Sequence, residues 1–257
     1  MFKPLTERIE EFAKIYPDRI KELEELFNSP TNVYIDFANV INWEDKLGWR
    51  IGLKRLKQLF LSFDTVKEMR IYSGTLVGDS RSEKSIEQMK KYGYYVITKS
   101  VKIMKFPINI STIPSTSPDI IKQFIRQPLL KKLNIETIEF INARLKELNK
   151  QGVFYLEDKK CNFDVELGSD MIIDAAIGKI QNFILWSGDS DFVDPLMRLI
   201  DTGKTCIIFS TARKISRELN ELRKEGLLIY DIQKIRNFIC WPRYIDWNDI
   251  KSKKDSI

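Results

Sequence analysis

The chain has 257 residues, of which 43% are hydrophobic and 30% charged, values typical of a globular protein that exclude intrinsic disorder. Its apolar runs are far shorter than the roughly 20 residues needed to span a bilayer, and its charged N-terminus does not resemble a signal peptide. Histidine is absent, which excludes Ser-His-Asp triads and histidine metal ligands. Any catalysis must therefore use carboxylates, Lys, Tyr, Cys or a bound cofactor.

Three cysteines, Cys161, Cys206 and Cys240, show no metal-binding spacing and are odd in number. This pattern predicts a reduced, cytoplasmic protein without a membrane association.

Residues 6–27 carry apolar side chains at helical spacing with a break at Pro17, and predict one or two helices. We expect this N-terminal extension, residues 1–30, to pack on the domain or to serve a protein partner or a second copy of the chain. Strands and helices then alternate, which predicts a mostly parallel sheet with helices on both faces. The predicted strands are 33–36, 69–73, 94–98, 182–187, 205–209 and 227–230, and the predicted helices 51–62, 82–91, 165–179, 192–200 and 213–224.

An insertion at about residues 100–157 interrupts this alternation, because the segment is too long for an ordinary connection. It contains four prolines and a predicted helix at 135–149, and we expect it to lie over the active-site edge. The main domain is therefore predicted at 31–240, followed by a tail at 241–257.

The net charge of +6 is concentrated between Thr98 and Asn134, a segment that contains seven basic residues and one acidic residue, Asp119. Such a patch suits a polyanion such as RNA, and is equally consistent with a solvated lysine-rich face. Phe106 and Phe124 could stack a base there, although a core position is the favoured interpretation for both. The candidate RNA-binding residues are Lys99, Lys102, Lys105, Lys122 and Arg126.

Acidic residues follow two of the predicted strands. Asp36 ends the first strand, and Asp189 and Asp191 lie in the motif Ser187-Gly188-Asp189-Ser190-Asp191-Phe192 after a later one. Asp164 begins the helix at 165–179. These ends converge at the carboxyl edge of a parallel sheet, where ligands bind. Crowded carboxylates repel one another unless a divalent cation such as Mg²⁺ or Mn²⁺ neutralises them.

Each of these residues also has a structural interpretation. Asp191 and Asp164 precede helices and are natural N-caps, and Asn39 could stabilise a turn after the first strand. Ser187 and Ser190 could support a metal site or satisfy the turn backbone.

Three further acids recur every four residues on the predicted helix at 165–179 and form a stripe that we interpret as a solvated face. They are Glu166, Asp170 and Asp174, of which Asp170 could reach the site.

Three segments together resemble the NYN domain, a branch of the PIN-like nuclease superfamily: residues 34–40, residues 164–171, and residues 187–192 with Gly203-Lys204. The resemblance extends over about residues 31–231 without the insertion. It implies a PIN-like Rossmannoid three-layer fold and a metal-dependent ribonuclease. It also implies metal-binding roles for Asp36, Asp164, Asp189 and Asp191, with Asn39 and Asp170 as additional polar residues.

The expected function is hydrolysis of RNA phosphodiester bonds by a Mg²⁺ or Mn²⁺ site, leaving a 5′-phosphate and a 3′-hydroxyl. One alternative is an inactive RNA-binding or scaffold module with the same fold. Another is a phosphohydrolase for small phosphate esters, although the Asp-x-Asp pair of such enzymes usually follows the first strand, and here it lies late in the chain.

Overall fold

The computed structural model describes residues 1–76, 78–211 and 214–254. It divides into two compact units: a main unit, residues 1–100 and 161–257, and an insertion unit, residues 101–160. None of the helices within the described ranges is long and apolar enough to cross a membrane.

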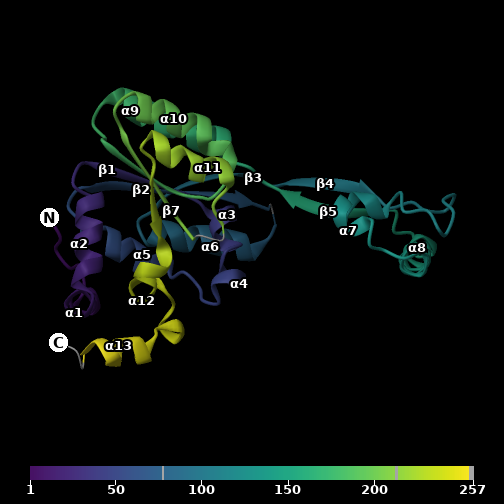
Figure 1. Ribbon diagram of the computed structural model, residues 1–257, viewed down its shortest axis with the longest axis horizontal. Coiled ribbons are helices and arrows are strands. Elements are labelled where there is room, and N and C mark those ends of the chain that lie inside the picture. The colour runs from purple at the N-terminus through teal and green to yellow at the C-terminus, as the bar shows by residue number, and fades with distance from the viewer. Residues whose placement is uncertain (77, 212–213, 255–257) are drawn as a thin grey trace. The chain divides into compact units, whose positions relative to one another are not determined.

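A six-stranded parallel sheet forms the centre of the main unit (Figure 1), in the order β3-β2-β1-β6-β7-β8. The strands are β1 Thr31–Asp36, β2 Val66–Thr75, β3 Tyr95–Ser100, β6 Asn182–Trp186, β7 Thr205–Ser210 and β8 Leu228–Asp231. The predicted α/β class with a parallel sheet is confirmed. Strand β1 is buried along its whole length, as expected of a central parallel strand covered on both faces.

Side chains alternate between two hydrophobic cores along each strand, because successive residues of a strand point to opposite faces. Val33 and Ile35 of β1 join the core beneath one face, and Tyr34 joins the other. Figure 1 shows α9 and α10 on one face and α2, α5 and α12 on the other. These helices are α9 Asp164–Ile177, α10 Val193–Asp201, α2 Pro17–Leu26, α5 Leu53–Phe60 and α12 Arg236–Ile239.

The N-terminal helices belong to the main unit. Helix α1, Glu7–Ile15, ends before Pro17, which begins α2 because proline is tolerated in the first turn of a helix. Their apolar side chains lie in the same core as the sheet, and Phe12 packs edge-on against Phe238. The C-terminal helix α13, Trp247–Lys254, contacts this layer through a hydrogen bond of 2.8 Å from Tyr16 to Asp249. The predicted extension therefore covers one side of the central sheet.

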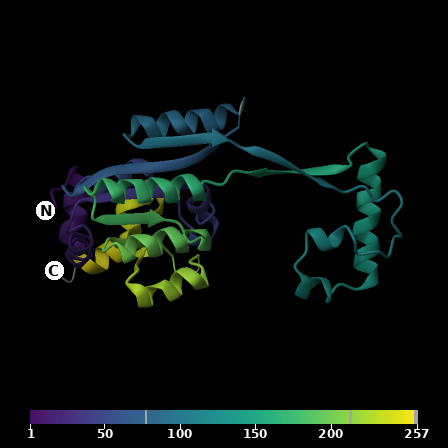
Figure 2. The same cartoon turned by 90° about the horizontal axis from the view of Figure 1, so that it is seen from above.

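The insertion unit contains an antiparallel ribbon that the sequence patterns do not predict. Strands β4, Lys102–Pro107, and β5, Tyr155–Lys160, pair along their full length, with exposed side chains throughout. Helix α8, Ile135–Lys150, lies at the far end of the ribbon (Figure 2) and includes the predicted helix at 135–149. The unit has a small core of its own around Ile108 and Ile110.

Several helices after the sheet strands agree with prediction and others do not. Helix α6, Ser80–Lys91, starts two residues before the predicted helix at 82–91. The short helices α3, Phe37–Ile41, and α4, Glu44–Leu47, were not expected. Helix α11, Arg217–Glu221, falls within the predicted 213–224 segment, whose first residue lies outside the described ranges.

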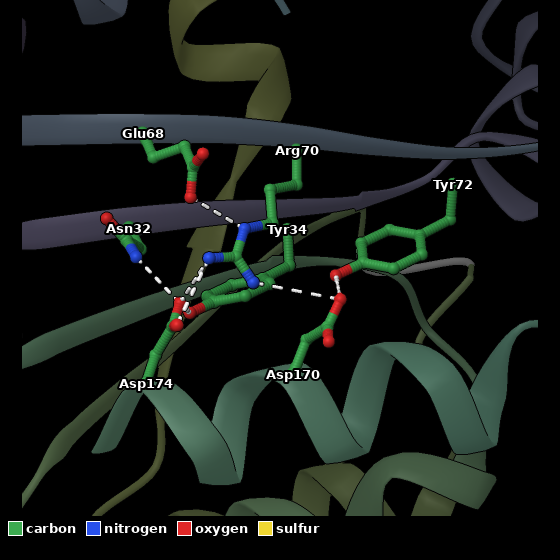
Figure 3. A network of polar contacts seen from close by, with 7 residues as sticks. All are labelled: Asn32, Tyr34, Glu68, Arg70, Tyr72, Asp170 and Asp174. Atoms are coloured by element: carbon green, nitrogen blue, oxygen red, sulfur yellow. Dashed lines mark hydrogen bonds and ion pairs between the residues drawn. The ribbon is translucent and has the colours of Figure 1, made fainter. Parts of the chain in front are cut away.

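A buried polar network fixes α9 against the sheet (Figure 3). The Asp174 carboxylate accepts hydrogen bonds from Asn32, at 2.8 Å, and from Tyr34, and forms an ion pair of 3.0 Å with Arg70. Arg70 also binds Glu68 at 2.7 Å on its own strand. Helix α9 is thereby joined to β1 and β2 by charged groups as well as by apolar packing.

Asp170 belongs to the same network, because it accepts a hydrogen bond of 2.7 Å from the Tyr72 hydroxyl and lies 3.7 Å from Arg70. The interpretation of the acidic stripe as a solvated face is therefore wrong for Asp174, which is buried, and for Asp170, which faces the sheet. The helical period places both acids above β2, where Arg70 neutralises them.

Replacing Asp174 with Ala should destabilise the fold by about 3 kcal/mol, because it leaves the Arg70 guanidinium and the Tyr34 hydroxyl without a buried partner. Urea denaturation would measure the change. Glu10→Gln, which removes the exposed ion pair with Lys14, serves as the control and should leave stability unchanged within error. An Asp174→Ala variant as stable as that control would contradict a structural role for the network.

Candidate metal site

Asp36 lies at the carboxyl end of β1 and is 8% exposed. Its Oδ1 accepts a hydrogen bond of 3.2 Å from the Asn39 backbone N–H and so caps α3. Burial raises the pKa of Asp36, and the nearby charge of Asp189 adds to this rise, while hydrogen bonds from Asn39 and Ser187 oppose it. The carboxylate is thus held at the sheet edge at an electrostatic cost.

Ser187 links Asp36 to the turn after β6. Ile35 pairs with Trp186 in the sheet, which places the next residues, Asp36 and Ser187, side by side. The fully buried Ser187 hydroxyl donates to Asp36 Oδ2 at 3.3 Å and accepts from the Asp189 backbone N–H at 3.3 Å. The serine therefore fixes the spacing between two of the candidate ligands.

Asp164, Asp189 and Asp191 form a compact cluster, in which one carboxylate oxygen from each lies within 4.8 Å of the others. Asp164 is the first residue of α9, and the other two flank Ser190 in the turn that leads to α10. Burial raises the pKa of Asp164 to about 6, and a hydrogen bond to Asp191 and the charge of Asp189 contribute to the rise.

The helix caps in the structure differ from those expected from sequence. Asp191 does not cap α10; Asp189 accepts a hydrogen bond of 3.3 Å from the Asp191 N–H and caps the short 3-10 helix Ser190–Phe192. Asp164 does not cap α9 either, since the N-cap residue is Phe163. Within the described residues, Asp164 and Asp191 therefore make no helix-capping hydrogen bond through their carboxylates.

An open hollow of about 790 Å³ adjoins the cluster and is lined by Asp164, Asp191, Lys99 and Glu166, among others. Lys99 forms an ion pair of 2.6 Å with Glu166, and its ammonium lies 4.8 Å from the centre of the Phe163 ring. One of the predicted RNA-binding lysines therefore lines the same hollow as two of the candidate metal ligands.

Other predicted site residues lie around this centre or away from it. Asn39 uses its side-chain oxygen to accept a hydrogen bond of 2.9 Å from Trp43, which stabilises the loop after β1. Ser190 begins the 3-10 helix, and Asp170 is engaged by Tyr72 and Arg70 rather than by the cluster.

The remaining predicted RNA-binding residues, Lys102, Lys105, Lys122 and Arg126, are exposed on the insertion unit. Lys105 lies over the Tyr155 ring at 4.2 Å, and Lys122 pairs with Asp119 at 2.9 Å. Phe106 and Phe124 are 37% and 49% exposed and contact each other, so the interpretation of both as core residues is wrong.

Sequence reasoning missed two residues that shape the turn and the helix start. Asn162 accepts a hydrogen bond of 2.9 Å from the Asp164 N–H and so holds the start of α9. Gly188 has no room for a side chain, because a Cβ there would lie 1.8 Å from the Lys214 carbonyl oxygen. The Asn-x-Asp spacing in the sequence could have indicated the role of Asn162. The role of Gly188 depends on a contact with Lys214, which is distant in sequence.

The carboxylates fit a hard divalent cation. All candidate ligands are Asp oxygens, the type that Mg²⁺ and Mn²⁺ prefer, and no ion pair with a basic residue is present at Asp36, Asp164, Asp189 or Asp191 within the described ranges. The raised pKa values of Asp36 and Asp164 reflect negative charge and burial that a bound cation would offset.

Asp164→Asn should stabilise the metal-free protein at pH 7.5, because the neutral amide removes the cost of ionising a crowded carboxyl. The folded pKa of about 6 lies above that of the unfolded chain, so this cost is small at pH 4, grows as the pH rises from there to about 6, and is fully present at pH 7.5. After allowance for solvent screening we expect about 1 kcal/mol, or about 3 °C in melting temperature. Melting curves in EDTA at both pH values would test this, and a variant less stable than wild type at pH 7.5 would contradict it.

Comparisons with known proteins give one family and one structural neighbour. The search of curated proteins finds no match. A crystal structure of a protein of unknown function from Vibrio parahaemolyticus is similar at 14% identity and a TM-score of 0.48, over 82% of this chain and 95% of that chain.

A family model described as the NYN domain matches residues 108–225. The matched segment contains Asp164, Asp189 and Asp191 together with most of the insertion unit, whereas Asp36 lies before it. The extent therefore differs from the one expected from the motifs, which included the first strand and left the insertion out. The match nevertheless agrees with the family that the acidic motifs resemble: residues 108–225 of this chain are similar to the NYN domain.

Proposed function

We propose that the chain is a metal-dependent ribonuclease that hydrolyses RNA phosphodiester bonds. The observation that carries this proposal is the cluster of Asp164, Asp189 and Asp191 oxygens within 4.8 Å, in a segment that matches the NYN domain. Asp36, joined to the cluster through Ser187, completes the set of candidate ligands.

Asp36, Asp164, Asp189 and Asp191 would hold one or two Mg²⁺ or Mn²⁺ ions. When bound, such ions supply activation of a water molecule and neutralisation of charge on a phosphoryl oxygen. The protein's own groups orient the ligands: Ser187 spaces Asp36 from Asp189, and Asn162 fixes the backbone of Asp164. Lys99, in the same hollow, can pair with a phosphate of the substrate while remaining next to Glu166.

Exposed cations on the insertion unit support RNA as the substrate. Lys102, Lys105, Lys122 and Arg126 can meet phosphates, and the exposed pair Phe106 and Phe124 offers ring faces to bases. Three free cysteines, two of them buried, support the cytoplasm as the compartment.

Mutation of the candidate ligands should abolish RNA cleavage. Labelled single-stranded and structured RNA would be incubated with Mg²⁺, Mn²⁺ or EDTA, and Asp36→Asn and Asp189→Asn should each reduce the rate by about 100-fold or more. Asp194→Asn, an exposed acid in the first turn of α10, is the matched control and should cleave like wild type. Cleavage unchanged in both ligand variants would refute the proposal, and wild-type binding without cleavage would favour the inactive module instead.

Metal binding should raise the melting temperature, and more so at pH 7.5 than at pH 5.0. Mn²⁺ at 100 times its Kd would stabilise the fold by about 2.7 kcal/mol, or roughly 5–10 °C. Below about pH 6 the proton on Asp164 competes with the cation, so the rise should shrink. Asp189→Asn should show little rise at either pH, and an equal rise in this variant would place the metal elsewhere.

A further inference from the structure

A second hollow of the main unit, about 550 Å³, lies between α3, α5, α6 and the turn at Trp241-Pro242. Its lining includes Phe37, the residue that follows Asp36 in the chain, and Val40 and Ile41 of α3. One residue of the lining is therefore adjacent in sequence to a candidate metal ligand. Its size is within the range of small-ligand sites, and a single nucleotide is a ligand of this class.

Aromatic and cationic side chains line this hollow together with Glu44, whose carboxylate lies 3.7 Å from the Arg50 guanidinium. Trp241 is 40% exposed, and the Arg50 guanidinium lies 5.4 Å from its ring centre. Arg243, two residues further along the chain, lies 5.4 Å from the centre of the same ring but is not among the residues that line the hollow. Tryptophan rings and guanidinium planes both stack on nucleobases, and guanidinium groups also pair with phosphates.

The Trp241 ring is held in a fixed orientation. Its Nε1–H donates to the Ile51 carbonyl at 3.1 Å, and its backbone N–H donates to the Arg50 carbonyl at 2.9 Å. A rigid exposed aromatic loses little conformational entropy when a ligand stacks on it. The main chain therefore presents the ring and the adjacent guanidinium as a preformed surface.

Two basic residues, Lys54 and Arg55, occupy the first turn of α5 at the edge of the hollow, and that turn has no acid. Cations are unfavourable at a helix N-terminus, because the helix dipole places partial positive charge there. Arg55 is engaged by the Cys240 carbonyl at 2.8 Å, whereas Lys54 is exposed. The position of Lys54 is thus poor for helix stability and favourable for binding an anion.

We propose that this hollow binds one nucleotide of a single-stranded RNA next to the scissile phosphate, with its base against Trp241 and Arg50 and a phosphate facing Lys54. This inference rests on the proposed ribonuclease function, which selects RNA among the nucleic acids. A single strand is required because a base that stacks on Trp241 must be free of its own helical stack. The link between the acids and this hollow is the short connection from Asp36 at the end of β1 to Phe37 at the start of α3.

The test is binding of a fluorescein-labelled single-stranded RNA, followed by anisotropy in EDTA so that no cleavage occurs. Trp241→Ala should weaken binding at least about fivefold, the effect of losing one stacked base. Trp241→Phe should bind within about twofold of wild type, because the phenyl ring can still stack on a base. This variant loses only the side-chain hydrogen bond to Ile51. Trp247→Ala, an exposed tryptophan on α13, is the matched control and should bind like wild type.

The contribution of Lys54 is read from the salt dependence of binding. Lys54→Gln should reduce the slope of log K against log salt by about 0.7, the value for one phosphate contact on a single strand. Lys21→Gln, an exposed lysine on α2, should leave the slope unchanged. Equal slopes in wild type and Lys54→Gln would overturn the phosphate contact.

The outcomes separate this inference from the proposed function. Equal affinity for wild type and Trp241→Ala, or equal losses in the Ala and Phe variants, would overturn the stacking role even if the chain cleaves RNA. A duplex RNA or a matching DNA strand bound as tightly as the single-stranded RNA would overturn the assignment to single-stranded RNA. A chain that binds RNA through Trp241 and never cleaves it would instead contradict only the ribonuclease function.

Discussion

Repulsion among carboxylates at the carboxyl edge of the sheet is the constraint around which the main unit is organised. Asp164, Asp189 and Asp191 are clustered, and Asp36 is joined to them through Ser187. Left alone, such groups would move apart or take up protons. The sheet prevents the first outcome, because β1 and β6 are hydrogen-bonded neighbours whose register places Asp36 beside Ser187. The second corresponds to the raised pKa of Asp164, to which burial contributes most and the neighbouring Asp191 and Asp189 contribute further.

Helix α9 shows how a structural acid differs from a candidate site acid. Glu166 is paired with Lys99, and Asp170 and Asp174 are paired with Arg70, so three acids on the helix have basic partners. Asp164, at the start of the same helix, instead has Asp189 and Asp191 as its charged neighbours. Spacing along the helix does not distinguish these acids; the charge that faces each one does.

The fold was predictable from sequence to the extent that it follows from local patterns. Alternating strands and helices predict the parallel sheet, and a parallel sheet brings the ends of β1 and β6 to one edge. The burial of Asp174 was not predictable in this way, because it depends on Arg70, which lies about 100 residues away in sequence. The sequence of the strand that carries Arg70 does not indicate this contact. Gly188 is similar, since only its contact with Lys214 explains the residue.

The sequence predicts that there is an insertion, but it does not predict the structure of that insertion. Prolines and length mark a separate segment, whereas the β4–β5 ribbon pairs residues from the two ends of the insertion, and half of these residues carry charged side chains. The exposed rings of Phe106 and Phe124 show the same limit: aromatic residues in a sequence predict a core, but the small core around Ile108 and Ile110 does not include these two rings.

The two ends of α9 have opposite electrostatic roles, and the contrast explains how the fold tolerates its candidate site. Toward the C-terminus, Asp174 is neutralised by Arg70 and satisfied by Asn32 and Tyr34, so that end is fixed to β1 and β2. At the N-terminus, Asp164 adds repulsion that favours displacement of the helix from the turn after β6. A helix anchored at one end can keep an unfavourable group in place at the other, because moving Asp164 away would also break the buried network. The ion pairs of Arg70 therefore help to maintain the close approach of carboxylates on which the proposed cation binding depends.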